Sequence, residues 1–88
     1  MRVDELIWDD RNEEHIAKHG VSPDEVEEAC QTKPLRVRLV RDDTYALLGV
    51  TDGGRHLAVF LAPRGNNSFY VVTAREMDVR ERKSFGRR

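Results

Sequence analysis

The middle of the chain constrains the fold most, because its apolar residues follow the two-residue period of strands and not the period of a helix. Four such segments occur, and they cover residues 35–40, 44–50, 55–61 and 68–74. The first largely alternates apolar and arginine side chains, and the third is almost continuously apolar from Leu57 to Leu61, as expected of a central strand. Turn residues separate the segments at Asp42-Asp43, Asp52-Gly53-Gly54 and Pro63 to Asn67. Short turns between consecutive strands predict a four-stranded antiparallel meander.

A first helix is predicted near the N-terminus. Asp9 or Asp10 can cap its start, and the helix is expected to run through Ile16. Gly20 follows at the position where a left-handed residue ends many helices. Before the helix, residues 6–8 form a short apolar lead-in, either a brief strand or a plug against the helix.

A second helix begins immediately after this stop. Ser22 and Glu25 form a capping box, with Pro23 at the first helical position. Lys18 and His19 are therefore predicted in the last turn of the first helix, beside a corner that fixes where they point. Cations are common at helix C-termini for electrostatic reasons alone, so the placement fits a structural corner as well as an RNA-handling site.

The pattern returns to helical after Arg75, where Asp78 and Glu81 form another capping box. Residues 79–85 form the body of this last helix, and Gly86 is its stop. The order of elements predicts a single α+β domain over residues 1–88: two N-terminal helices, a four-stranded antiparallel meander sheet and a C-terminal helix. We expect the helices to be grouped on one face of the sheet.

Charge is divided unevenly along the chain, although the net charge is only −1. Residues 1–34 carry ten acidic and four basic side chains, whereas residues 35–88 carry six acidic and eleven basic ones. The basic second part fits a polyanion or an acidic protein partner, while a solvated polar surface explains most individual charges equally well.

Cysteine content and hydropathy exclude several classes of protein. The single cysteine, Cys30, rules out an internal disulfide and a thiol-based zinc site, and its helical position predicts a buried, inert thiol. No apolar run is long enough to span a bilayer, and the N-terminus lacks the pattern of a signal peptide. We therefore expect a cytoplasmic protein with no membrane partner.

Two motif blocks resemble those of the BrnT toxins of bacterial type II toxin–antitoxin systems. The front block comprises Trp8, Asp9, Arg11, Asn12, Lys18, His19, Gly20, Ser22 and Glu25. The rear block comprises Thr73, Ala74, Arg75, Met77, Arg80, Glu81 and Arg82. The resemblance implies a RelE-like fold and a ribonuclease that arrests translation without a cofactor. It also implies a BrnA-like ribbon-helix-helix antitoxin as partner. Toxin and antitoxin would form a heterotetramer around an antitoxin dimer, and the complex would bind operator DNA through the antitoxin.

RNA cleavage without a metal requires a base, an acid and cations for the charge that builds on phosphorus. His19 and Lys18 are candidate catalytic residues, and His15 is a candidate RNA contact on the same helix face. The alternative is that these histidines only cap or pack the helix end. Two histidines four residues apart could also bind a metal, but no third ligand is evident, and no metal site is predicted.

Arginines in the second half of the chain are candidates for phosphate contacts, because the planar guanidinium suits bidentate binding. Arg75 and Arg80 are predicted to be catalytic, and Arg82 to bind RNA or simply to be solvated. We expect the tip of the first helix pair, with Lys18, to lie beside Arg75 and to form with it a pocket for a sugar-phosphate chain. Further candidate RNA-binding residues are Arg41, Arg64 and Trp8. Their alternatives are protection of an edge strand, an ordinary surface loop and a place in the core, respectively.

A second function class stays open beside the ribonuclease. Glu76 stands where the family pattern commonly has a basic residue, and Phe85 where it frequently has tyrosine. The chain could therefore be a catalytically weak, toxin-like binding module that serves as antitoxin partner or corepressor. A free-standing RNA-binding protein is a third class, but the sequence lacks the aromatic sheet motif that would support it.

Overall fold

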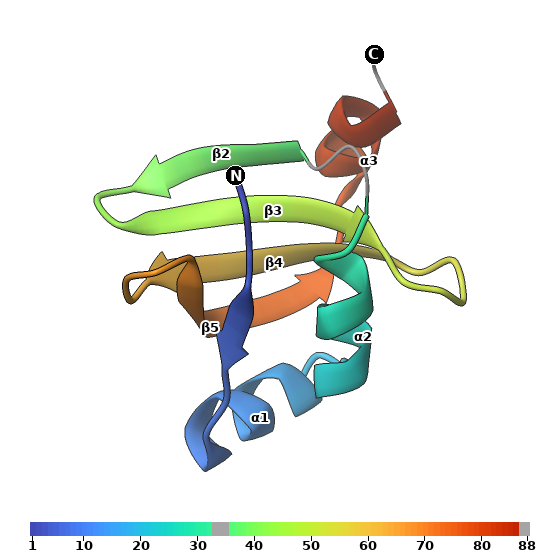
Figure 1. Ribbon diagram of the computed structural model, residues 1–88. Helices are drawn as coiled ribbons and strands as arrows, with labels where there is room; N and C mark the ends of the chain where they lie inside the picture. The colour runs from blue at the N-terminus through green and yellow to red at the C-terminus, as the bar shows by residue number, and fades with distance from the viewer. Residues whose placement is uncertain (33–35, 87–88) are drawn as a thin grey trace.

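The computed structural model describes residues 1–32 and 36–86, which form three short helices and one sheet (Figure 1). The elements are β1 (Glu5–Ile7), α1 (Asp10–Ala17), α2 (Pro23–Ala29), β2 (Arg36–Arg41), β3 (Thr44–Val50), β4 (His56–Pro63), β5 (Ser68–Glu76) and α3 (Val79–Gly86). Leu35, the expected start of the first meander strand, lies outside the described residues. No helix in the described part of the chain is long and apolar enough to cross a membrane.

The sheet has five strands in the order β1-β5-β4-β3-β2, and β1 runs parallel to β5. The antiparallel meander from β2 to β5 is present, but the prediction of a four-stranded, wholly antiparallel sheet is wrong. β1 joins the sheet because Leu6 is buried opposite Phe69 and because the Asp4 N–H donates to Asn67 O at 2.9 Å. Three residues are too few to show a strand period, and their partners lie more than sixty positions away.

The corner between α1 and α2 forms as the sequence predicts. Asp9 is the N-cap of α1, and its partner in the capping box is Asn12, whose side chain accepts from the Asp9 N–H at 2.9 Å. Gly20 has a positive φ of 71°. The bonds from Gly20 N–H to Ala17 O and from Val21 N–H to Ile16 O are those of a Schellman motif. α1 ends at Ala17 with Lys18 as its C-cap, so Lys18 closes the last turn through the bond from its N–H to Glu14 O, and His19 lies in the turn that follows.

The helices lie on both faces of the sheet, so the expectation that they share one face is wrong. α1 and α2 cover one face, where Ile16 and Val26 pack in the same core as Leu57 and Val59. Residues 1–4 cross this face as well (Figure 1). On the other face α3 places Phe85 against a small cluster of Leu48, Ala58 and Met77.

The alternation along β4 explains this two-sided arrangement. Leu57, Val59 and Leu61 point toward α1 and α2, and Ala58 points toward α3, so the strand is buried on both faces. The expectation that this segment is a central strand is confirmed. Cys30 is also buried as expected, and burial raises the pKa of its thiol to about 12, with a smaller contribution from Glu27.

Gly49 marks the closest approach of α2 to the sheet. A Cβ at this position would lie 2.1 Å from Ala29 O, and Thr32 Oγ1 accepts from the neighbouring Val50 N–H at 2.8 Å. We predict that Gly49→Ala destabilises the fold by about 2 kcal/mol or more, because the contacted atom is backbone and cannot rotate away. Urea unfolding followed by circular dichroism measures the loss.

The matched control is Gly53→Ala in the β3–β4 loop, where a Cβ would come no closer than 3.9 Å to Thr51 Oγ1. This variant should unfold within about 0.5 kcal/mol of the parent. Equal unfolding midpoints for the two variants would contradict the close approach.

Candidate functional site

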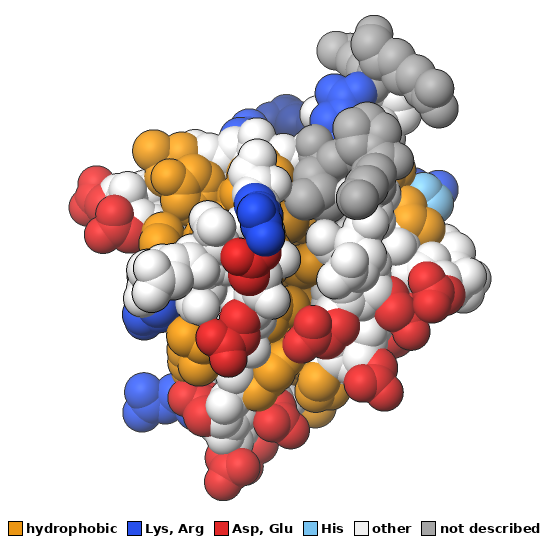
Figure 2. Space-filling view, viewed as in Figure 1, with side chains coloured by type: hydrophobic (Ala, Val, Ile, Leu, Met, Phe, Trp, Pro, Cys, Tyr) orange, Lys and Arg blue, Asp and Glu red, His pale blue; other side chains and the backbone are white. Residues whose placement is uncertain are grey.

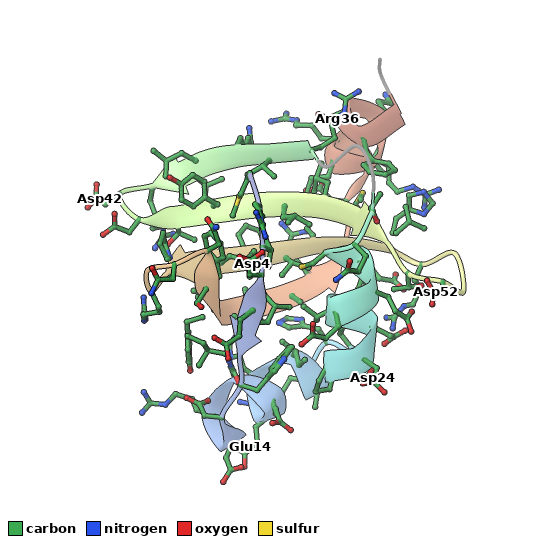
Figure 3. All side chains as sticks on the ribbon, in the orientation of Figure 1. Asp4, Glu14, Asp24, Arg36, Asp42 and Asp52 are labelled. Carbon is green, nitrogen blue, oxygen red and sulfur yellow. The ribbon has the colours of Figure 1, made fainter. Side chains whose placement is uncertain are left out.

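The sheet face that α3 only partly covers is rich in arginine. Four arginines from three elements border a pocket of about 400 Å³, which we call the arginine pocket. They are Arg36 and Arg38 of β2, Arg75 of β5 and Arg80 of α3. Its floor includes Ala46 and Leu48 of β3, and Arg36 lies beside α3 (Figure 3). The register explains the convergence, because Arg36 and Arg38 pair with Leu48 and Ala46, and Arg75 pairs with Ala58 on the same face.

Arg75 is held in one orientation by three hydrogen bonds and a contact with an aromatic ring. Its Nη1 and Nη2 donate to Glu81 Oε1 at 2.6 Å and to Glu81 Oε2 at 2.9 Å, and Nη1 also donates to Glu76 O at 3.1 Å. Its guanidinium carbon lies 5.2 Å from the centroid of the Phe60 ring. No bond from the Nε–H occurs among the described residues, so this edge of the guanidinium is available to a ligand.

Glu81 connects this arginine to the start of α3. Its N–H donates to Asp78 Oδ1 at 2.8 Å, and its own Oε1 accepts from the Asp78 N–H at 2.9 Å, which confirms the predicted capping box. One carboxylate therefore both caps the helix and fixes the arginine at the end of β5. The spacing of Arg75, Asp78 and Glu81 in the sequence is what allows both.

The pKa shifts of the pair keep both groups charged near neutral pH. The bond to Glu81 raises the pKa of Arg75, an effect that exceeds the opposing effect of its burial. Burial alone would raise the pKa of Glu81, but the bonds to Arg75 and to the Asp78 N–H outweigh it, so the pKa lies below its ordinary value. Glu81 is therefore an ionised partner and not a proton donor near neutral pH.

A second pocket of about 360 Å³ adjoins the first on the same face, and Arg75 lines both. We call it the Phe60 pocket. Its other lining residues are Val40, Arg41, Thr44, Phe60, Val72 and Thr73. The register of β4 and β5 shifts between Phe60 and Leu61, which leaves Val72 unpaired and places it with Thr73 along this pocket.

Lys18, His15 and His19 lie together on the opposite face of the sheet. The rings of His15 and His19 are 5.7 Å apart at the exposed end of α1. Neither pocket on the arginine side is lined by any of the three residues. The structure therefore does not form the joint pocket of Lys18 and Arg75 that convergence of the two motif blocks would require, because α1 packs on the face toward which Ala74 points.

The remaining predicted RNA contacts are scattered. Trp8 packs against the main core, and its Nε1–H donates to Glu27 Oε2 at 3.0 Å. Arg64 lies in the β4–β5 turn, 5.3 Å above the ring of Tyr70, at the other end of β5 from Arg75. Arg82 is exposed on α3 and lines neither pocket, whereas Arg41 lines the Phe60 pocket.

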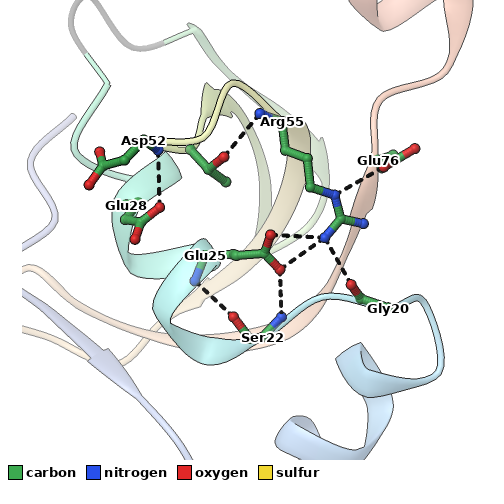
Figure 4. Close-up of polar contacts among 8 residues, drawn as sticks. Gly20, Ser22, Glu25, Glu28, Asp52, Arg55 and Glu76 are labelled. Carbon is green, nitrogen blue, oxygen red and sulfur yellow. Dashed lines mark hydrogen bonds and ion pairs between the residues drawn. The ribbon is translucent and has the colours of Figure 1, made fainter.

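Arg55 is a positioning residue that sequence reasoning missed. Its Nη1 donates to Gly20 O at 2.8 Å and to both oxygens of Glu25, and its Nε donates to Glu76 Oε2 at 3.0 Å (Figure 4). It ties the α1–α2 corner to the end of β5. No local signal marks Arg55, because the bonding partners of its side chain are all distant in the sequence. Phe60 was missed, and Thr73 was recognised only as part of the rear motif block, because the β4–β5 register cannot be read from either strand alone.

The two faces differ in charge. Acidic side chains gather over α1 and α2 (Figure 2), where seven of the fifteen residues of the two helices are Asp or Glu. They are Asp10, Glu13, Glu14, Asp24, Glu25, Glu27 and Glu28. Four arginines border the pocket on the other face against two carboxylates, Asp78 and Glu81. Such a segregated cationic surface attracts polyanions.

A protein-family model described as "Ribonuclease toxin, BrnT, of type II toxin-antitoxin system" matches residues 8–81. The family match and the cationic pocket on the sheet face place the molecule in the class of ribonuclease toxins of type II toxin–antitoxin systems. The chain belongs to the BrnT family.

A solved structure supports this assignment. The crystal structure of the Brucella abortus ribonuclease toxin BrnT is similar to this chain, with 26% sequence identity and a TM-score of 0.68. The match covers 84% of this chain and 96% of that one. A comparison with curated proteins gave no match.

The Arg75–Glu81 pair predicts a pH-dependent stability. Because the pKa of Glu81 is lowered in the folded state, its contribution is present above the ordinary glutamate pKa of about 4.3 and is lost as the pH falls through the folded value. Glu81→Gln should reduce the free energy of unfolding at neutral pH by about 1 kcal/mol and flatten its decline below pH of about 4.

Urea unfolding at a series of pH values measures both effects, and the exposed Glu13→Gln on α1 is the matched control. A parallel pH dependence in Glu81→Gln and the parent protein would show that the pair does not carry the effect.

Proposed function

We propose that this BrnT-family protein cleaves RNA at the arginine pocket, with Arg75 and Arg80 stabilising the charge that develops on the scissile phosphate. The observation that carries the proposal is the convergence of four arginines from β2, β5 and α3 on one pocket. Two of these arginines belong to the rear motif block, and two come from a strand some forty positions earlier. Local sequence spacing alone does not produce such a cluster, so it supports a site for a polyanionic ligand.

The proposed reaction is attack of a ribose 2′-hydroxyl on the adjacent phosphorus, which expels the 5′-oxygen of the next nucleotide. Negative charge builds on the non-bridging oxygens, and fixed guanidinium groups stabilise it best when they are already in place. Arg75 meets this condition through its contacts with Glu81 and Phe60. In this proposal arginine side chains supply the cations, and the reaction uses no metal ion or cofactor.

Lys18 and His19 can meet the same RNA chain only around the outer edge of β5. β1 pairs with β5 only from Ser68 to Tyr70, so the end of β5 toward Glu76 has no strand partner on that side among the described residues. Arg55 holds the α1–α2 corner beside this end. We propose that RNA passes around this edge, with Lys18 and His19 in contact with it and available for proton transfer.

The biological role proposed is that of a cytoplasmic toxin that inhibits translation and is neutralised by its antitoxin. Membership in a type II toxin family implies an antitoxin partner. We propose a BrnA-like ribbon-helix-helix protein, assembled with the toxin as a heterotetramer around an antitoxin dimer and bound to operator DNA through the antitoxin. The second candidate function is the catalytically weak, toxin-like binding module. One observation favours it: Glu81 already occupies two donors of Arg75.

We predict that the double variant Arg36→Ala/Arg80→Ala abolishes growth arrest when the gene is induced without its antitoxin. Removing two cations from the pocket should lower the rate of RNA cleavage by about a hundredfold or more, given the usual effect of removing one transition-state donor. Growth curves and gel analysis of cleaved RNA by the purified protein measure the two effects, with EDTA present to test independence from metal.

Arg2→Ala is the matched control, because Arg2 is exposed and pairs only with Asp4 among the described residues. The proposal fails if the parent protein neither arrests growth nor cuts RNA, which is the result expected of the weaker binding module.

The double variant Lys18→Ala/His19→Ala tests the other face. If RNA passes around the edge of β5, this variant should cut RNA at least about tenfold more slowly than the parent protein. Single-turnover rates give the comparison, and an unchanged rate would confine the chemistry to the arginine face.

A further inference from the structure

We propose that the Phe60 pocket is a nucleobase subsite that receives the base of a nucleotide whose phosphate lies in the arginine pocket. The inference rests on the proposed function and adds to it a site for the base. It follows from the composition of the pocket, from one polar atom within it and from its position beside Arg75.

The pocket presents apolar surface that the free protein leaves uncovered. Val72 of β5 is 41% exposed and Val40 of β2 is 37% exposed, and the partly buried ring of Phe60 lies between them on the sheet. The bulge in β5 adds to this surface, since it places the unpaired Val72 on the rim. A flat, largely apolar ring would bury this surface, as nucleobases do on protein sheets.

Thr73 supplies a polar atom that lacks a partner. Its Oγ1 is buried, and it is the single such side-chain atom without a hydrogen bond in the described part of the protein. An unsatisfied buried hydroxyl is costly, and a partner brought by a ligand would remove that cost. A hydroxyl can donate or accept, so it can bond to the edge of a base after a small side-chain rotation.

Charge favours a nucleotide over a neutral or basic peptide side chain that would fit the same space. Arg41 and Arg75 flank the pocket, and none of the described residues that line it is acidic. The volume of about 360 Å³ falls within the range of small-ligand sites. Because Arg75 lines both pockets, a phosphate bound at its free edge has its own or a neighbouring base beside the Phe60 pocket.

The test compares two probes whose backbones are alike. One is a short 2′-O-methyl RNA, which cannot be cleaved because its 2′-oxygen is blocked, and the other is an abasic ribose-phosphate oligomer of the same length. The parent protein should bind the RNA about tenfold more tightly or better, in line with the usual contribution of base stacking. Fluorescence anisotropy at fixed salt measures both dissociation constants.

Val72→Asp should remove most of this preference, because it places a carboxylate on the rim of the pocket. Val79→Asp is the matched control: Val79 is 72% exposed on α3, lines neither pocket and carries the same added charge when substituted. It should keep the preference. Thr73→Val, which keeps the shape of the side chain and removes its hydroxyl, should change which of the four homopolymer bases binds best while leaving affinity for the abasic oligomer unchanged.

Three results would overturn the subsite: equal affinity of the parent protein for both probes, equal loss of preference in Val72→Asp and Val79→Asp, or a Val72→Asp variant that loses only antitoxin binding. The last result would mark the pocket as an anchor for protein. Cleavage of RNA by a protein without base preference would refute the subsite and leave the proposed function standing. Base-dependent binding without any cleavage would support the subsite and refute the proposed function.

Discussion

The ion pair between Arg75 and Glu81 joins the last strand of the sheet to the first turn of α3, and both pockets depend on it. Glu81 can hold Arg75 because the capping box fixes its side chain at the helix start. Arg75 in turn lies against Phe60 and forms the wall shared by the two pockets. Without this pair, α3 would keep only its small cluster around Phe85 to hold it on the sheet.

The pair contributes more to geometry than to stability. The side chain of Arg75 is 36% exposed, so solvent screens its attraction to Glu81, and such a pair contributes about 1 kcal/mol or less. Its effect is to remove the rotamer freedom of a long side chain before a ligand arrives. Arg55 acts in the same way on the other side of the sheet, where it bonds to Glu25, Glu76 and Gly20 O.

Local chemistry made part of the fold predictable. The caps at Asp9 and Ser22, the positive φ of Gly20 and the turns of the meander depend on residues close in sequence, and these predictions are confirmed. The fifth strand, the face occupied by α3 and the partners of Arg55 depend on residues far apart, which no local pattern records.

The candidate site was likewise predictable only in its local part. Both motif blocks were recognisable, but the separation of Lys18 from Arg75 follows from strand alternation between Ala74 and Arg75, which became visible only with the register of β5.

The carboxylate of Glu81 would repel a polyanion bound in the arginine pocket, but the arginines outnumber the carboxylates there. Four arginines against Asp78 and Glu81 leave the lining of the arginine pocket with a net charge of +2. A phosphate therefore still meets a positive field, while the bidentate edge of Arg75 is already used by Glu81. Arg75 must then act on a phosphate through its remaining Nε edge and its charge, and bidentate binding falls to Arg36, Arg38 or Arg80. A cation fixed in advance needs no reorganisation when charge develops on the ligand, which is the condition for electrostatic stabilisation of a transition state.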